Sequence, residues 1–511
     1  MRNFLVALST LSAAGLFLQC TSIADVRYDD SIQVPTNCDP SADPGSDTPE
    51  VAAGAAACVD NSFAVFVDAT NGDDTFVGTK ETPVASLGKA LSILGNMTRI
   101  YICGSDTFKE SISLSSGDRA ASLYGGYDCG TWQYNSAVIP TVATTTSPAL
   151  RVTGNGTSPL TLTVSDVSVV SGDAAVDSGA SSNAIFIANA DVTLRRVKAT
   201  AGKGANGNLG ASYSSNYYTA DLDSNPANGN TGGTEKRCAC KDNATSSTGG
   251  QGGNGAGAGG NPPAEDGSKG STVPTATDPE GVKDGVGGPG FIDGGHKCQQ
   301  GNDGADANNG GDGGRGALSY GTLGTTSWTP TSGSDGTFGS PGQGGGGGGG
   351  TIGVGGNTGG GGGSGACGGC GGSKGLGGTG GGASIAIALY KSTLTLDTCT
   401  LQTGSAGKGG DGSIGQDGAA GGQGSNTDKG GGCAGGNGGN GSGGGGGGGG
   451  AGGISVGILY SADSTLNEDG ATHITPGAAG DPGGGGGNGT PSGASDASTG
   501  HPGLSQATLQ L

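Results

Sequence analysis

The stretch NAIFIANADVTLRRVKATAGKGANG, residues 183–207, decides the fold, because the chain repeats its pattern twice. The second copy covers residues 386–412 and the third covers residues 455–481. Each copy is an apolar run, a short break, a second run in which apolar and polar residues alternate, and an exit into glycine. Since each unit of this kind buries its apolar face against the next, the repetition predicts stacked coils around one apolar interior.

Equivalent residues of the copies fall into columns, which should lie on adjacent coils about 4.8 Å apart. The earlier segment at residues 160–170 fits the same alignment. One column holds Val164, Leu194 and Leu396, and another holds Val167, Val197 and Cys399. Cys399 therefore occupies an inward position, where a free cysteine behaves as a small hydrophobic residue. Arg195 and Asp397 also share a column, which predicts a surface ion pair between neighbouring coils.

The segment that precedes the repeats carries a family resemblance. Residues 67–74 read VDATNGDD, residues 78–83 read GTKETP, and Leu87, Ala90 and Leu91 follow at helical spacing. This segment resembles the opening segment of right-handed parallel β-helix proteins of the pectate-lyase-like type. Residues 121–132, ASLYGGYDCGTW, are similar to a corner beside that cap in some bacterial secreted β-helix proteins. The resemblance implies a cap over the end of the solenoid, whose apolar core would otherwise be exposed.

We therefore expect an all-β chain: a short single-stranded right-handed parallel β-helix with an N-terminal cap and long Gly-rich loop excursions. The handedness comes from the resemblance alone. The expected division is a signal peptide (1–24), a polar linker (25–57), the cap and first coils (58–200), a Gly-rich excursion (201–382), a coil (383–403), a second excursion (404–453), the last coil (454–476) and a Gly-rich tail (477–511).

Glycine dominates the excursions. The chain has 120 glycines in 511 residues and only 32% hydrophobic residues, so the apolar core must be confined to the repeats. All three glycine-rich segments leave after the second strand of a copy, which places them on one side of the solenoid. Their glycine runs lack a Gly-X-Y period, which excludes collagen. The composition resembles that of PE-PGRS surface proteins. Two states stay open: flexible coil, or bundles of extended polyproline-II-like strands in which only glycine permits close approach.

The first residues predict export. Met1–Asn3 is a short basic start, Phe4–Leu18 is an apolar run too short to span a bilayer, and Ser22 and Ala24 offer small residues for cleavage. Lipidation of Cys20 is the alternative, although the residue before it is not small. We therefore expect a bacterial protein that is secreted or held on the outer cell surface, with membrane contact only through such a lipid anchor.

The cysteines fit an oxidising compartment. With Cys20 processed and Cys399 buried, ten remain, which permits five disulfides. These ten are Cys38, Cys58, Cys103, Cys129, Cys238, Cys240, Cys298, Cys367, Cys370 and Cys433. Proximity in sequence favours the pairs Cys38–Cys58 and Cys103–Cys129. The alternative for the later cysteines is a zinc site that would also use His296, because their short spacings suit tetrahedral Cys and His ligation.

Charge restricts the partners and cofactors. A net charge of −20 argues against nucleic acid and against an anionic membrane surface, which would repel the chain. No cofactor is expected, with calcium as the alternative. Residues 301–307 and 409–414 half-match a calcium-binding nonapeptide, but neither is repeated in tandem and Ile414 replaces the acidic residue. The remaining partners are polysaccharides or other cell-surface components.

No catalytic motif can be assigned. The charged residues expected on outward faces are Asp166, Asp191, Arg195, Arg196 and Asp397. A polysaccharide hydrolase would need a pair of carboxylates on one face, and a fold does not by itself imply a reaction. We therefore expect a structural or adhesive protein whose β-helix presents Gly-rich loops for envelope or matrix interaction. A polysaccharide-acting lyase or hydrolase is the alternative.

Overall fold

The computed structural model describes residues 38–39, 42–62, 64–116, 120–156, 159–218, 221–242, 244–273, 285–291, 298–425, 431–492 and 495–511. The predicted signal peptide, Cys20 and His296 lie outside these residues. The chain forms two compact units, Met1–Cys58 and Val59–Leu511. No helix among the described residues has the length and apolar character needed to cross a bilayer.

The first unit contains a short helix within the segment that we expected to be a polar linker. α1 (Pro49–Ala56) starts with proline at its first position, where the missing N–H is no loss, and carries Glu50 in its first turn. A disulfide joins Cys38 to Cys58. Part of the expected linker is therefore structured, because alanine-rich sequence after an N-terminal proline favours a helix.

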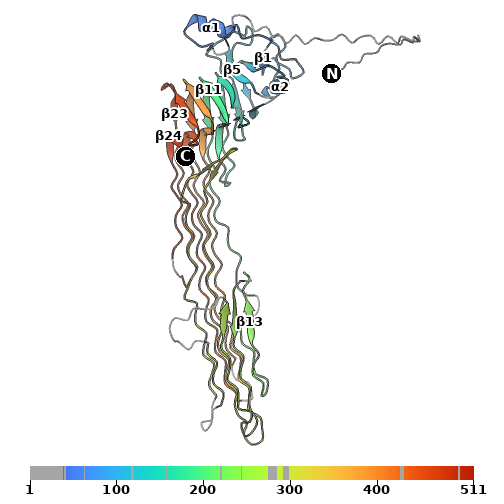
Figure 1. Ribbon diagram of the computed structural model, residues 1–511, viewed down its shortest axis with the longest axis vertical. Helices are drawn as coiled ribbons and strands as arrows, with labels where there is room; N and C mark the ends of the chain where they lie inside the picture. Colours follow the sequence, from blue (N-terminus) through green and yellow to red (C-terminus); the bar gives the residue numbers. More distant parts are fainter. Residues whose placement is uncertain are drawn as a thin grey trace, which may run out of the picture. The chain divides into compact units, whose positions relative to one another are not determined.

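The second unit is a parallel β-helix in which three sheets follow one another along the chain. Sheet A contains β1 (Ala64–Asp68), β2 (Arg99–Cys103), β5 (Ser122–Tyr127), β8 (Leu160–Ser165), β11 (Ala190–Arg195), β19 (Thr393–Asp397) and β22 (Thr465–Glu468). Sheet B contains β3 (Thr107–Phe108), β6 (Thr141–Thr144), β9 (Ser168–Ser171), β12 (Lys198–Ala201), β20 (Thr400–Thr403) and β23 (His473–Thr475). Sheet C contains β4 (Ile112–Ser115), β7 (Leu150–Thr153), β10 (Ser182–Ala188), β18 (Ser384–Tyr390), β21 (Ser455–Tyr460) and β24 (Ser505–Gln510). From β2 onward, each coil takes one strand from each sheet, and the coils are stacked on one another (Figure 1).

The predicted columns are confirmed. Leu194 pairs in parallel register with Val164 on one side and with Leu396 on the other. The three residues of the second column, Val167, Val197 and Cys399, are buried in the same core cluster. Cys399 is a free thiol whose burial raises its pKa to about 11, so it stays protonated and unreactive. The alternating sequence thus fills the interior with stacked apolar side chains.

α2 (Leu87–Ser92) packs against the core beside β1. Ser86 caps it by accepting a hydrogen bond from the Lys89 N–H, and its buried residues Leu87, Ala90 and Leu91 join the core cluster. Apolar side chains of α2 therefore shield core residues near the first strand of sheet A, as the resemblance implied.

Sheet C also has an apolar outer face, unlike the Thr-rich outer face of sheet A. Phe186, Ala388 and Leu459 point outward there and form a second cluster with Trp328. Trp328 belongs to a hairpin of β16 (Gly321–Leu323) and β17 (Trp328–Pro330) that is inserted in the first excursion. The hairpin therefore covers apolar surface that would otherwise face water.

Candidate functional site

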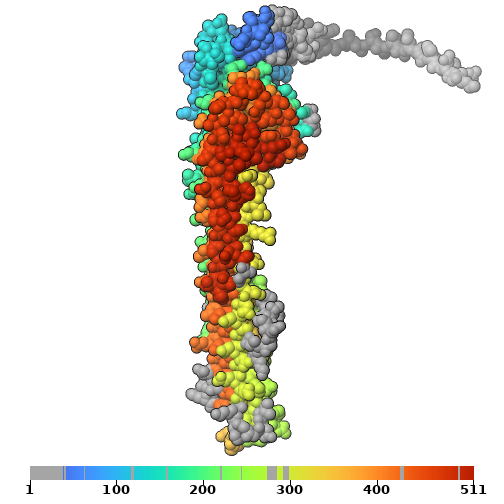
Figure 2. Space-filling view, turned by 90° about the vertical axis from the view of Figure 1, so that its left-hand side faces the viewer, coloured from blue at the N-terminus to red at the C-terminus, as the bar shows by residue number. Residues whose placement is uncertain are grey.

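The three Gly-rich excursions form one ordered bundle. Each connects a sheet B strand to the next sheet C strand: β12 to β18, β20 to β21, and β23 to β24. The last of these corrects the expected Gly-rich tail, because residues 505–510 return as β24 and pair in parallel with β21. The excursions run side by side away from the solenoid (Figure 1), and the C-terminal residues, in red, cover both the solenoid and the adjoining bundle (Figure 2).

Hydrogen bonds between the extended segments repeat every third residue. Five backbone N–H groups of one segment donate to carbonyls of an antiparallel segment in the order Gly336 to Gly375, Gly339 to Gly372, Gly342 to Gly369, Gly345 to Ala366, and Gly348 to Gly363. A polyproline II helix has three residues per turn and no internal hydrogen bonds, so all of its polar groups are free to bond neighbours. The excursions are therefore polyproline-II-like strands in a bundle, and the flexible-coil alternative is wrong for the described residues.

The uninterrupted glycine runs lie in the centre of the bundle. A Cβ atom on Gly446 would overlap the backbone of Gly486, one on Gly447 that of Leu376, and one on Gly448 that of Arg315. Three successive residues thus face three different neighbours, and the pattern repeats along Gly443–Gly450. Because every face of this strand touches another backbone, no position tolerates a side chain, and all eight residues are buried.

Where a strand lies at the edge, every third residue bears a polar side chain. Asn437 and Asn440 are exposed members of Gly-Gly-Asn repeats. The Asn437 side-chain oxygen accepts the Gly424 N–H at 2.8 Å, and the Asp303 carboxylate accepts the Asn437 N–H at 2.7 Å. Side-chain oxygens thus accept hydrogen bonds from edge N–H groups that have no neighbouring strand among the described residues. This explains why Asp, Asn and Ser recur among the glycines.

Three disulfides cross-link the bundle. Cys238 lies in β13 (Lys236–Ala239), and Cys240 directly follows this strand. Because the two cysteines are two residues apart, they lie on one face of the extended chain. Cys367 and Cys370 lie three residues apart, which places them on one face of a polyproline II helix. The bonds Cys238–Cys367 and Cys240–Cys370 therefore join two residues on one face of a β-strand to two residues on one face of a polyproline II helix. β13 pairs with β14 (Ser246–Gly249), which pairs with β15 (Ser271–Val273).

The third bundle disulfide, Cys298–Cys433, joins the first excursion to the second. With Cys38–Cys58 and Cys103–Cys129, all ten cysteines named from the sequence are in disulfides. The later cysteines therefore offer no free thiolates for the zinc alternative. Five disulfides indicate an oxidising, extracytoplasmic compartment.

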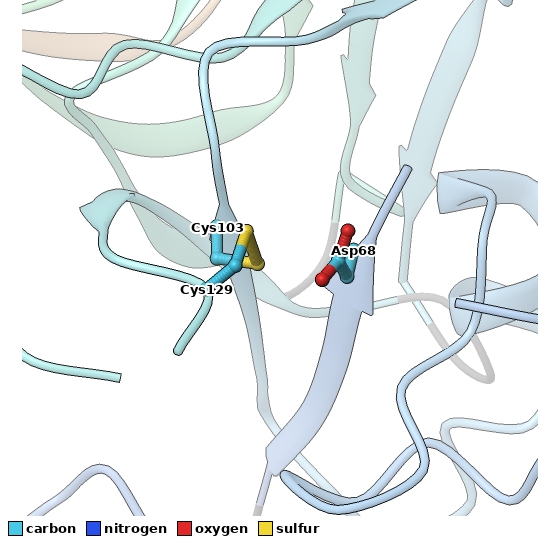
Figure 3. Close-up of side chains that lie close together, drawn as sticks. All are labelled: Asp68, Cys103 and Cys129. Atoms are coloured by element: carbon cyan, nitrogen blue, oxygen red, sulfur yellow. A yellow bond between two sulfur atoms is a disulfide. The ribbon is translucent and has the colours of Figure 1, made fainter. Parts of the chain in front are cut away.

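Asp68, Cys103 and Cys129 are the one set of acidic and sulfur groups close enough together to suggest a metal site among the described residues (Figure 3). The two cysteines form a disulfide, whose sulfurs are poor metal ligands. The Asp68 carboxylate is occupied as well, since it accepts the N–H groups of Thr70 and Asn71, each at 2.9 Å. Asp68 therefore fixes the turn after β1, and the disulfide joins β2 to the loop after β5.

Both segments of the calcium alternative form hydrogen bonds within the bundle; in the second, the Asp411 carboxylate accepts the Gly484 N–H at 2.7 Å. In residues 301–307 the carboxylates of Asp303 and Asp306 accept the N–H groups of Asn437 and Asn440. These carboxylates line a shallow pocket of about 420 Å³. In the second segment Ile414 is 62% exposed. Among the described residues, neither segment contributes to a close group of three or more acidic, histidine or cysteine side chains.

The five charged residues expected on outward faces lie near one another on successive coils but do not form one cluster. Arg195 pairs with Asp397 as predicted, with 3.8 Å between Nε and Oδ2. Asp166 instead lies at the corner between sheets A and B, where Arg196 Nε and Nη2 donate to its carboxylate at 2.7 and 2.9 Å. Asp191 lies at the other end of the sheet A strands, near the start of β11, in a pocket of about 300 Å³.

Asp166 organises the corner between sheets A and B. Its side chain is 4% exposed and also accepts the hydroxyls of Ser165 at 2.7 Å and Tyr134 at 3.0 Å. Burial, followed by the Asp166 charge, raises the pKa of Tyr134 to about 12. Asp166, Arg196 and Thr398 adopt left-handed backbone at this corner, with φ between 49° and 56°. The ion pair therefore fixes a turn that the backbone alone disfavours.

Replacing Asp166 by Asn is expected to lower the free energy of unfolding by about 2 kcal/mol, because Arg196 keeps a partly buried charge without its counter-ion. The matched variant Asp397→Asn removes the exposed partner of Arg195 and should change it by less than about 1 kcal/mol. Urea unfolding of both variants measures the difference. Equal effects would contradict the assignment of Asp166 as the organising residue.

Sequence reasoning missed three residues of these sites: Tyr134, Lys391 and Asp463. Tyr134 reaches Asp166 from a loop outside the repeats, so no column revealed it. Lys391 and Asp463 precede sheet A strands in the break of each copy and line the pocket that holds Asp191. Both residues are charged and lie two positions before the sheet A strand in successive copies, and this pattern could have revealed them.

Comparison with known proteins gives no relative. The chain matches no protein-family model, no curated protein and no solved structure.

Proposed function

We propose that this protein is a structural or adhesive protein of the bacterial cell surface or its matrix, in which the β-helix carries a rigid Gly-rich bundle outward. One observation carries the proposal: three excursions from three coils form a single bundle, held by repeating backbone hydrogen bonds and cross-linked by disulfides. An excursion of this length needs no order merely to connect two strands. Its order supports a role in which the bundle itself bears or presents something.

The geometry suits a spacer. One extended segment of the bundle begins after the hairpin, at Pro330. About 20 residues later, the Thr351 N–H donates to the Gly360 carbonyl in the last hydrogen bond of its antiparallel pairing. At about 3.1 Å per residue this segment spans about 60 Å. The turn that follows exposes Val354, whose side chain is 83% accessible. The bundle thus offers a stiff arm that ends in an exposed turn.

The proposal also covers the type of solenoid and the route by which the chain reaches the cell surface. The cap segment and the GGY-x-C corner support a right-handed solenoid of the pectate-lyase-like type, and the glycine content supports a PE-PGRS-like surface role. Secretion after cleavage near Ala24, or anchoring through a lipid on Cys20, would both deliver the chain to the outer surface. Five disulfides are consistent with either route.

The test is adhesion without turnover. Beads that carry the full chain should bind surfaces coated with cell-envelope or matrix polysaccharide and should release no reducing or unsaturated sugar. Beads that carry a variant with a disrupted bundle should bind less, because the presenting arm is lost. Release of sugar by the intact chain would instead support the alternative, a polysaccharide-acting lyase or hydrolase.

The alternative has one observation in its favour. Asp191 and Asp463 line the same pocket, and paired carboxylates are what glycoside hydrolysis uses. Polysaccharide breakdown that Asp191→Ala or Asp463→Ala abolishes would establish it. Breakdown that survives both substitutions would place the reaction elsewhere.

A further inference from the structure

A polar pocket lies where sheet C passes into sheet A. Asn189 and Asp191 reach it from the first repeat, Lys391, Ser392 and Thr393 from the second, and Asp463 from the third. Gly156 and Pro159 of the preceding coil complete its wall. Because coils are about 4.8 Å apart, the pocket crosses about 14 Å of the solenoid. Its length suits a chain-like ligand that lies across the coils.

The groups that line the pocket are polar and of both signs. The carboxylates of Asp191 and Asp463 have no hydrogen bond or ion pair with another described side chain. By contrast, Asp68 and Asp397 in sheet A and Asp166 at its corner with sheet B all have partners. Among the described residues, no aromatic or large aliphatic side chain lines the pocket. A ligand that fits is therefore rich in hydroxyl groups, which carboxylates accept and an ammonium donates to.

Lys391 is the one cationic residue among the described residues that line the pocket. Its backbone is left-handed, with φ of 48°. Asn189 occupies the same corner of the preceding coil and has φ of 52°. Asparagine tolerates this conformation, but lysine is strained in it. Its ammonium lies 5.6 Å from the centre of the Tyr390 ring, an exposed contact that adds little. The corner conformation thus recurs from one coil to the next, and in this coil the residue at the corner is a cation that lines the pocket.

The Ser392 hydroxyl has a structural role by contrast. It accepts the Ala190 N–H at 3.1 Å and donates to the Tyr390 carbonyl at 2.8 Å, so it ties two coils together. The groups left for a ligand are the two carboxylates, the ammonium and the Asn189 and Thr393 side chains. A chain with a net charge of −20 repels polyanions, and Lys391 offsets one of the two carboxylates in the pocket lining. Mixed charge of this kind favours a neutral ligand.

We infer that this pocket binds a neutral oligosaccharide, with Asp191 and Asp463 accepting hydroxyl groups of the sugar and Lys391 donating to ring or glycosidic oxygens. This inference rests on the proposed function, because it names the class of polysaccharide to which the chain would adhere. The pocket lies on the solenoid and the bundle is a separate surface, so the two can be tested apart.

The experiment is calorimetric titration of the full chain with cellohexaose, mannohexaose and xylohexaose, and with hexamers of galacturonate and glucosamine as charged probes. At least one neutral hexaose should bind, and Asp191→Ala and Asp463→Ala should each weaken its binding at least tenfold. The matched control is Asp481→Ala, which removes an exposed carboxylate of the bundle and should leave binding unchanged.

Lys391→Asn gives the sharpest readout. It removes the ammonium but relieves the backbone strain, so binding should weaken at least tenfold while the melting temperature rises. A stabilised variant with unchanged binding would overturn the inference, as would binding of the charged hexamers alone or of no hexaose at millimolar concentration. If no hexaose binds but beads with the full chain still adhere, the inference about the pocket is wrong and the proposed function stands. If a hexaose binds but the beads do not adhere, the proposed function fails.

Discussion

Replacing Gly447 by alanine is expected to lower the free energy of unfolding of the bundle by about 3–5 kcal/mol. The added Cβ would overlap the backbone of Leu376, and backbone cannot rotate away as a side chain can. Forcing the strands apart costs about 1–3 kcal/mol for overpacking and about 1 kcal/mol for each hydrogen bond that breaks. The N–H bond from Gly447 to the Ser413 carbonyl, at 2.8 Å, is the first that this separation would break.

Gly487→Ala is the matched control on a neighbouring strand. A Cβ there would meet only the Ile414 side chain, at 4.0 Å, which is ordinary contact. Alanine also loses less conformational entropy on folding than glycine, so this variant should be stabilised by about 0.4–1 kcal/mol. The two substitutions therefore have opposite signs. Hydrogen exchange of bundle amides and denaturant unfolding measure both, and equal effects would contradict close packing of the strands.

Removing both Cys238–Cys367 and Cys240–Cys370 is expected to destabilise the protein by about 7 kcal/mol, although removing either alone should cost only about 2 kcal/mol. Each bond closes a loop with a sequence separation of about 130 residues. Once one bond is present, the other closes a ring of only a few residues. The remaining bond therefore still removes most of the entropy of the unfolded chain, and the two effects are not additive.

Cys298–Cys433 is the control for this prediction. Its sequence separation of 135 is similar, but no other disulfide lies beside it in the chain. Its removal alone should cost about 5 kcal/mol, more than twice the cost of removing either member of the adjacent pair. Paired Cys→Ser substitutions with denaturant unfolding give all four values. Additive costs for the adjacent pair would show that the bonds do not share a loop.

The solenoid could be predicted because its information is local and repeated. Alternating apolar residues define which side of each strand is buried, and the copies of residues 183–207 align their columns. The pairing of Leu194 with Val164 and Leu396, and the ion pair of Arg195 with Asp397, both followed from that alignment. The corner ion pair of Asp166 with Arg196 did not, because left-handed backbone turns both residues away from their strand neighbours.

The sequence by itself determined the stacked coils, the side from which the excursions leave, and which cysteines remain to be paired. Only the tertiary structure decided that the excursions form one bundle, which strands are neighbours within it, and that Asp191, Lys391 and Asp463 share a pocket. The physical reason is that glycine has no side chain with which to specify a neighbour. Backbone hydrogen bonds are the same at every glycine, so the register of the bundle is set by the common exit from the solenoid and by the disulfides.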